Sequence, residues 1–169
     1  MKSSNPSTTC SNCGEQTHVA RGIYRFRESG LGNVFLVNID MIRCSQCGNE
    51  DPVIPHLNEL MSVLALAVIR KPCPLNGNEV RFLRKYLKMT GEQFGQVLGV
   101  GKHHVSKWEN GADPVGPQSD RLIRAVAVVL GHNLQSHQEQ IGRVFADIDP
   151  TVREIEFKID PEAEEIQYA

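Results

Sequence analysis

Residues 89–111 read MTGEQFGQVLGVGKHHVSKWENG, and this stretch decides the fold of the second half of the chain. Glycines at positions 99 and 101 separate two runs, at about 91–98 and 102–109, in which apolar residues recur at helical spacing. Two short helices joined by this turn would pack their apolar faces together and cross steeply, as in a helix-turn-helix motif. The residues expected to form their shared core are Phe94, Val97, Leu98, Val100, Val105 and Trp108.

The second of these helices is expected to carry a polar outer face. Residues advance by about 100° each along a helix, so Val105 and Trp108 would face inward while His103, Ser106 and Lys107 share the opposite side. Short polar and basic side chains on a protruding helix suit the major groove of DNA, where base edges offer hydrogen-bond acceptors. We therefore predict that His103, Lys107 and Ser106 read bases.

The charge of the chain is unevenly distributed around this motif. The whole chain has a formal net charge of -2, but residues 70–107 contain eight Lys or Arg against two acids, a local charge of +6. Residues 142–169 contain three basic residues against eight acids, a local charge of -5. This asymmetry favours a basic binding surface with an acidic tail. The side chains expected to contact DNA phosphates are Lys102, Arg81, Arg84, Lys85 and Lys88.

The flanking sequence completes a small helical unit. Two more helices are predicted at about 77–88 and 118–130, and glycines and prolines separate all four. We therefore place a helix-turn-helix domain at residues 75–131. Residues 54–74 are interpreted as a further helix and a linker, because Lys71-Pro-Cys-Pro74 removes a backbone donor and restricts the residue before each proline. A domain boundary is predicted at this linker.

Four cysteines near the N-terminus form two similar motifs, Cys10-Ser-Asn-Cys13-Gly and Cys44-Ser-Gln-Cys47-Gly. Two CxxC turns can bring four thiolates to one tetrahedral Zn²⁺, and this site has no open coordination position. We therefore predict one structural zinc ion per chain, bound by Cys10, Cys13, Cys44 and Cys47. The rival interpretation, a redox dithiol, usually rests on a single CxxC pair. The fifth cysteine, Cys73, is interpreted as a small buried or idle thiol.

The sequence between the cysteine pairs predicts a β-hairpin. Residues 18–27 and 34–42 are rich in residues that favour strands, and residues 28–33 supply a turn. Residues 10–53 are therefore interpreted as a zinc-ribbon domain, and the polar residues 1–9 as a mobile leader.

The end of the chain, residues 132–169, is interpreted as an acidic extension. A weak helical pattern at 141–148 is followed by alternation of Ile155, Phe157 and Ile159 with charged residues, which predicts a half-buried strand. Ile166 and Tyr168 could form a second strand. The chain as a whole is predicted to be α+β with two domains, a zinc ribbon followed by an all-α helix-turn-helix domain and a short helix and strand extension.

Compartment and enzyme class follow from absent signals. The longest apolar run, Leu60 to Ile69, is shorter than the roughly 20 residues of a membrane span, and the N-terminus lacks the apolar core of a secretory signal. A cytoplasmic protein without a membrane partner is therefore expected. The segment His137-Gln-Glu139 superficially matches the His-x-Glu of a zinc deaminase, but that chemistry needs a proline-cysteine pair downstream, and both CxxC pairs lie upstream. We predict no enzymatic activity.

The motifs MTGEQFG, LGVG and VSKWENG, together with QSDRLIR at residues 118–124, resemble the Xre/Cro-like helix-turn-helix group. Their combination with a preceding CxxC and CxxC domain resembles the MqsA family of antitoxins, over about residues 10–131. This resemblance implies a homodimer formed through the helical domain, a palindromic operator, repression of the chain's own operon and a zinc domain that neutralises an RNA-cleaving toxin. It also places His103 and Lys107 at the family's base-reading Asn and Arg, and Gly91 where the family usually has Gln.

The predicted function is a sequence-specific, DNA-binding transcriptional repressor with a structural zinc site. Two versions stay open: the antitoxin of a basic ribonuclease toxin, bound by the zinc domain or the acidic tail, and a free-standing regulator. A third possibility is an RNA-binding zinc ribbon, in which exposed aromatic residues would stack on bases. The aromatic residues available for that role on the hairpin are Tyr24, Phe26 and Phe35.

Overall fold

A computed structural model describes residues 9–132, 134, 145, 148–151, 153–163 and 165–169 of the 169-residue chain. Residues 1–8 of the predicted leader, most of the predicted helical segment at 141–148 and the His137-Gln-Glu139 segment lie outside the described residues. None of the helices in the part described has the length and apolar character needed to cross a membrane.

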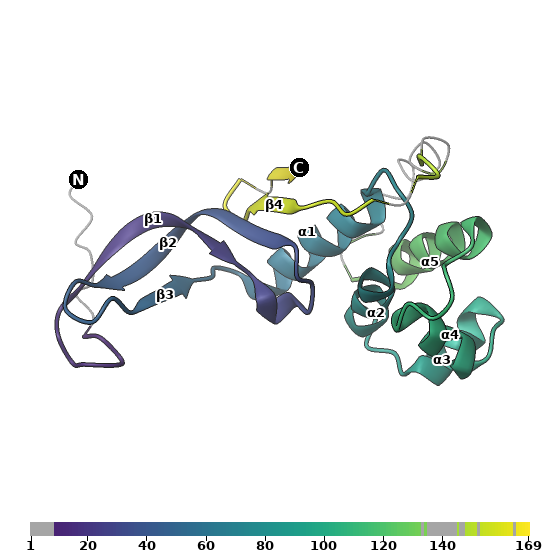
Figure 1. Cartoon of the computed structure of the whole chain (residues 1–169), viewed down its shortest axis with the longest axis horizontal. Coiled ribbons are helices and arrows are strands. Elements are labelled where there is room, and N and C mark those ends of the chain that lie inside the picture. Colours follow the sequence, from purple (N-terminus) through teal and green to yellow (C-terminus); the bar gives the residue numbers. More distant parts are fainter. Residues whose placement is uncertain (1–8, 133, 135–144, 146–147, 152, 164) are drawn as a thin grey trace.

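The N-terminal part is a twisted β-hairpin that extends away from the helices (Figure 1). Strand β1 (Thr17–Arg25) pairs antiparallel with β2 (Val34–Cys44), and the short 3₁₀ helix η1 (Arg27–Ser29) lies in the connection. The predicted hairpin is therefore confirmed. A third strand, β3 (Glu50–Val53), pairs antiparallel with the end of β2 and was not predicted, since it has only four residues and includes a proline.

An irregularity at Asn38 divides β2 into two parts. Asn38 has φ of 58°, and the register of β1 with β2 shifts at the facing position, between Gly22 and Tyr24. Before this point the even-numbered Val34 and Leu36 are buried, and directly after it the odd-numbered Ile39 and Met41 are buried. An irregular residue reverses which side chains face the core, because alternate side chains of a strand point to opposite faces.

The end of the chain returns to the N-terminal hairpin (Figure 1). Strand β4 (Phe157–Asp160) pairs parallel with residues 34–36 of β2, and β5 (Glu165–Tyr168) pairs antiparallel with β4. Both predicted tail strands are therefore confirmed. The strand with which they pair was not predicted. The sheet order is β1-β2-β4-β5, and β3 and β4 pair with different parts of the same edge of β2. The tail strands thus belong to the same sheet as the zinc-ribbon hairpin.

Within the described residues five α-helices follow the hairpin, and they agree with the predicted positions to within about two residues. They are α1 (Leu57–Arg70), α2 (Gly77–Tyr86), α3 (Gly91–Leu98), α4 (Lys102–Glu109) and α5 (Pro117–Leu130). Helix α1 lies against the sheet, and the hydroxyl of Tyr168 donates to the carbonyl oxygen of Ala67. The buried apolar residues of sheet, α1 and the helix-turn-helix unit form one continuous cluster.

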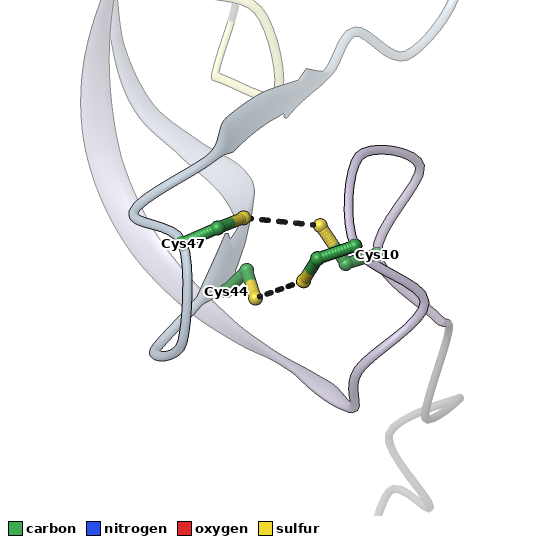
Figure 2. Close-up of side chains that lie close together, drawn as sticks. Cys10, Cys44 and Cys47 are labelled. Atoms are coloured by element: carbon green, nitrogen blue, oxygen red, sulfur yellow. Dashed lines mark hydrogen bonds between the residues drawn. The ribbon is translucent and has the colours of Figure 1, made fainter.

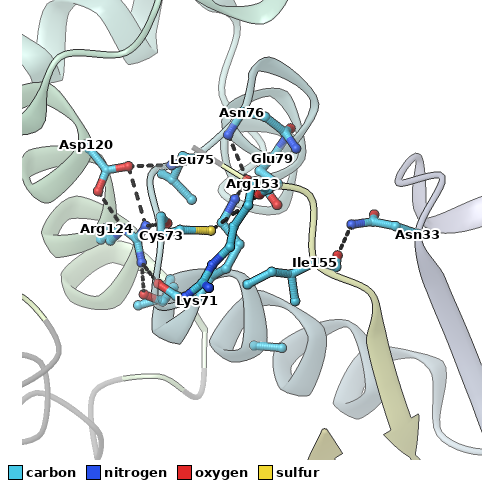
Figure 3. A network of polar contacts seen from close by, with 12 residues as sticks. Asn33, Lys71, Cys73, Leu75, Asn76, Glu79, Asp120, Arg124, Arg153 and Ile155 are labelled. Atoms are coloured by element: carbon cyan, nitrogen blue, oxygen red, sulfur yellow. Dashed lines mark hydrogen bonds and ion pairs between the residues drawn. The ribbon is translucent and has the colours of Figure 1, made fainter. Parts of the chain in front are cut away.

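The linker after α1 is held in place by a buried arginine of α5 (Figure 3). Arg124, which has no exposed surface, donates to the carbonyl oxygens of Ile69, Lys71 and Cys73 at 2.6, 2.8 and 2.7 Å. Asp120 accepts a further hydrogen bond from Arg124 at 2.8 Å, which balances the buried charge. The predicted linker is therefore a well-packed part of the fold.

The same linker also contacts the tail and α2. The Sγ of Cys73, fully buried, lies 3.4 Å from the carbonyl oxygen of Arg153, so this cysteine is a buried thiol as predicted. Lys71 forms a buried ion pair with Glu79 at 2.5 Å. Burial raises the pKa of Glu79, although the ammonium group of Lys71 opposes this shift.

Candidate metal centre and recognition helix

The four N-terminal cysteines meet at the far end of the hairpin (Figure 2). Their sulfur atoms all lie within 4.8 Å of one another; the Sγ atoms of Cys10 and Cys47 are 3.6 Å apart, and those of Cys13 and Cys44 are 3.5 Å apart. A tetrahedral zinc ion with Zn–S bonds of about 2.3 Å places its sulfur ligands about 3.8 Å apart. The residues present therefore fit a four-cysteine metal site.

The two CxxC-Gly turns, residues 10–14 and 44–48, are called knuckles below. They have the same backbone geometry, which explains their similar sequences. The amide of Gly14 donates to the carbonyl oxygen of Cys10 at 3.0 Å, and the amide of Gly48 donates to that of Cys44 at 3.0 Å. Gly14 and Gly48 have φ of 77° and 73°, a left-handed conformation in which other residues are strained. The glycine after each CxxC pair therefore closes the turn that directs both sulfurs inward.

Backbone amides also approach the sulfur atoms. The amide of Asn12 donates to the Sγ of Cys10 at 3.4 Å. The backbone amide of Asn49 and then the side chain of Asn12 lower the pKa of Cys47 to about 6, which favours the thiolate that binds metal. The amide at Glu15 lowers the pKa of Cys13, but the neighbouring Cys44 thiol and desolvation outweigh it and raise that pKa to about 12.

Helix α4 has the division of faces that the sequence predicts. Val105 and Trp108 are 1% and 3% exposed, whereas His103, Ser106 and Lys107 are all exposed. Lys102, the first residue of α4, is exposed as well. The ring of His104, beside this face, contacts the ring of Trp108 with centroids 4.8 Å apart.

Two of the predicted base-reading residues have contacts within the chain. The ammonium group of Lys107 lies 3.2 Å from a carboxylate oxygen of Asp113, and both side chains are largely exposed. The side-chain amide of Asn110 donates to the hydroxyl of Ser106 at 3.3 Å. Exposed contacts of this kind are weak and leave both side chains accessible to a ligand.

Two arginines predicted to bind phosphates contact Glu109 at the end of α4. Arg84 donates to both oxygens of Glu109, at 2.6 and 2.9 Å, and Arg81 donates to it at 3.2 Å. The side chain of Arg84 is 15% exposed and that of Glu109 is 8% exposed. The structure therefore gives Arg84 a role inside the domain, where it connects α2 to α4, and Arg81 shares this role from a more exposed position.

The remaining predicted phosphate contacts are Lys85, near the end of α2, and Lys88, in the turn after it. Both are exposed, and both line a groove together with residues of α1 and with His132. No residue of α3 or α4 is among those that line this groove in the part of the chain that the structure describes. Of the five predicted phosphate contacts, only Lys102 lies on α4.

Close backbone contacts between the helices fix the position of α4. A Cβ atom at Gly77 would lie 2.4 Å from the carbonyl oxygen of Trp108, and one at Gly95 would lie 2.6 Å from that of Val100. Only glycine permits such close approach of two backbones. The roles of these two glycines and of Glu109 were not predicted. The signal in the sequence was an acid at the C-terminal end of a helix, where the helix dipole disfavours negative charge.

The aromatic residues of the hairpin are used within the fold. Phe26 is 2% exposed, the guanidinium group of Arg25 lies over the ring of Phe35 at 5.9 Å, and the hydroxyl of Tyr24 donates to Glu28 at 2.5 Å. Phe26 is therefore buried and cannot stack on bases, whereas Tyr24 and Phe35 are partly exposed.

Comparison of the chain with models of known protein families and with curated proteins finds no match.

Proposed function

We propose that the chain is a sequence-specific, double-stranded-DNA-binding transcriptional repressor with one structural zinc ion. The observation that carries this proposal is the outer face of α4, on which His103, Ser106 and Lys107 are exposed while the inner face is buried. Helix-turn-helix proteins enter the major groove with a short helix that presents polar and basic side chains and packs against two other helices.

The side chains of this face take different roles. His103, Ser106 and Lys107 would contact base edges, and Lys102 at the start of the helix would contact a phosphate. The ion pair of Lys107 with Asp113 is exposed, so DNA can displace it at little cost.

A second copy of the chain would supply the other half of the operator contacts. Helix α5 leaves Leu122, Val129 and Leu130 at 43%, 57% and 45% exposed, and the partly buried Val126 lies between them on one helical face. We propose that this face forms a homodimer, which would place two recognition helices about 34 Å apart on a palindromic site.

Zinc would act by folding the end of the hairpin. Four cysteine ligands leave no position for a substrate or water, so the ion stabilises the two knuckles and performs no chemistry. We propose as a further role the binding of a basic ribonuclease as its antitoxin, for which the acidic residues 142–169 offer charge complementarity. Purification of the chain with the product of an adjacent gene tests that role.

A salt-titrated binding assay on the DNA upstream of the chain's own gene tests repression directly. His103→Ala and Lys107→Ala should each relax sequence preference by about 1–3 kcal/mol, because each removes a side chain that bonds to a base edge. Lys102→Ala should weaken binding to all sequences alike and reduce the salt slope by about one. Binding to DNA without any preferred site would disprove the proposal. The dimer is tested separately: Val129→Glu places a charge on the exposed apolar face of α5 and should convert a dimer to a monomer in light scattering.

A further inference from the structure

A basic groove lies where α1, α2 and His132, in the turn after α5, meet. Its volume is about 500 Å³, within the range of sites that hold small molecules. Its polar lining consists of Asn58 and Ser62 from α1, Lys85, Tyr86 and Lys88 from α2 and the turn after it, and His132. Within the described part of the chain no carboxylate lines it, so the local charge is positive.

The ammonium groups of the two lysines of this groove take part in no ion pair within the described residues. Among the described residues neither Lys85 nor Lys88 has a carboxylate partner, in contrast to Lys71 and Lys107, which form ion pairs. Their ammonium groups are therefore available to an anion. Lysine is a regular phosphate ligand because its ammonium group offers three donors and a concentrated charge.

The backbone conformation of Lys88 indicates that a lysine side chain is needed at this position. Lys88 has φ of 57°, and the amides of Lys88 and Met89 donate to the carbonyl oxygens of Lys85 and Arg84 to end α2. Glycine is the usual residue at such a left-handed helix end, since a side chain is strained there. A lysine at this position accepts that strain and places a cation at the groove, and strain of this kind concentrates at functional sites.

The floor of the groove is a chain of polar groups that joins three segments. The hydroxyl of Tyr86 donates to the carbonyl oxygen of His132 at 2.5 Å and lies 3.1 Å from the Oγ of Ser62. Ser62 in turn donates to the carbonyl oxygen of Asn58 at 3.2 Å. A ligand here would thus contact the helix that packs on the sheet, α2 of the helix-turn-helix unit and the end of α5 at once.

We propose that this groove binds the phosphate group of a small phosphorylated molecule. Lys85 and Lys88 would supply the charge, with hydrogen bonds from Asn58, Ser62 or His132, and Met61 beside them would contact an apolar part of the ligand. A small molecule fits better than the DNA backbone, because the groove is lined by α1 and by the residue after α5 and by no residue of α3 or α4 within the described chain.

Titration of the full-length, zinc-loaded protein with phenyl phosphate at fixed ionic strength tests this site. Amide chemical shifts should change at residues of α1 and α2 around the groove, with a dissociation constant of about 1 mM or tighter, and the uncharged analogue benzyl alcohol should bind at least about tenfold more weakly. The double variant Lys85→Gln/Lys88→Gly removes both charges and should weaken phenyl phosphate binding at least about tenfold. Glycine suits the left-handed backbone at position 88, so this variant should stay folded.

Lys102→Ala is the matched control, since it removes a lysine from the recognition helix. Lys102→Ala should weaken DNA binding and leave the affinity for phenyl phosphate within about twofold of wild type. The double variant should weaken phenyl phosphate binding and leave DNA affinity unchanged. No shift with phenyl phosphate, or equally weakened binding of it in both variants, would overturn the inference. A decrease of DNA affinity in the double variant as large as in Lys102→Ala would also overturn it, because the groove would then contact the DNA backbone. The phenyl phosphate arm decides the matter even if no operator is found.

Discussion

Glu109, the last residue of α4, accepts two hydrogen bonds from the guanidinium group of Arg84 in α2, at 2.6 and 2.9 Å. Such bidentate pairs fix both distance and orientation. This pair therefore fixes the position of α4 relative to α2.

Glu109→Gln should destabilise the helix-turn-helix unit and weaken DNA binding. It leaves Arg84, which is 15% exposed, without its counter-charge, and loss of one partner of a largely buried pair costs about 3 kcal/mol. Chemical denaturation measures the loss. Asp113→Asn, which removes only the exposed pair with Lys107, is the control and should cost less than about 1 kcal/mol. Equal effects of the two variants would show that the pair with Arg84 has no structural role.

The same pair should make stability depend on pH. Burial raises the pKa of Glu109, but hydrogen bonds from Arg84 and Arg81 outweigh it and hold the pKa below the ordinary value of 4.5. A depressed pKa in the folded state means that the stabilisation is complete above pH 4.5 and is lost as the pH falls through the folded-state pKa. The difference in unfolding free energy between wild type and Glu109→Gln should therefore shrink below pH 4.5. Both proteins have the same cysteines, so loss of zinc in acid cancels; a constant difference would contradict this account.

Gly77→Ala should separate α2 from α4. A Cβ at Gly77 would lie 2.4 Å from the carbonyl oxygen of Trp108 and 2.8 Å from that of Glu109, so the helices must move apart. We expect a loss of about 1–3 kcal/mol in thermal or chemical unfolding. Gly91→Ala is the matched control, because nothing lies within 4 Å of its Cβ position at the start of α3. That variant should be neutral or more stable by up to about 1 kcal/mol; similar losses for both would refute the packing argument.

The parts of this fold that sequence predicts are those set by local pattern. Helices α3 and α4 follow from apolar spacing and from the glycines between them, and the knuckles follow from two CxxC-Gly motifs. The faces of α4 were predicted because Val105 and Trp108 lie three residues apart on one side of a helix. Local spacing was sufficient for these features, but it wrongly placed Val97 in the shared core, since that side chain is 45% exposed.

The parts that sequence did not predict depend on contacts between distant residues. Alternation in the tail predicts a strand at Phe157, but nothing in it indicates a parallel pairing with Val34, more than a hundred residues earlier. Likewise, the basic side chain of Arg84 predicts a phosphate contact, and only the folded structure shows that its partner is Glu109. A basic residue's partner, internal or external, is decided by tertiary structure.

Metal removal should unfold the knuckles. Cys44→Ser removes a buried ligand and should abolish stoichiometric zinc, measured by elemental analysis, because three thiolates and a hydroxyl bind zinc far less well. The amide signals of the knuckles should then lose dispersion, and strong chelators should have the same effect on wild type. Cys73→Ala, a buried cysteine outside the cluster, should keep one zinc per chain. Zinc retained by Cys44→Ser would exclude the four-cysteine site.

The tail strand β4 should be essential to the stability of the N-terminal sheet. Phe157 has no exposed surface, pairs with Val34 and contacts the ring of Tyr168, with centroids 6.0 Å apart. Phe157→Ala should therefore cost about 3–5 kcal/mol and increase hydrogen exchange along β2. Lys158→Ala, the next residue on the strand and only partly buried, should cost less than about 1 kcal/mol. If the two variants were equally stable, the tail would not be part of the sheet in solution, and the edge of β2 would be open to other partners.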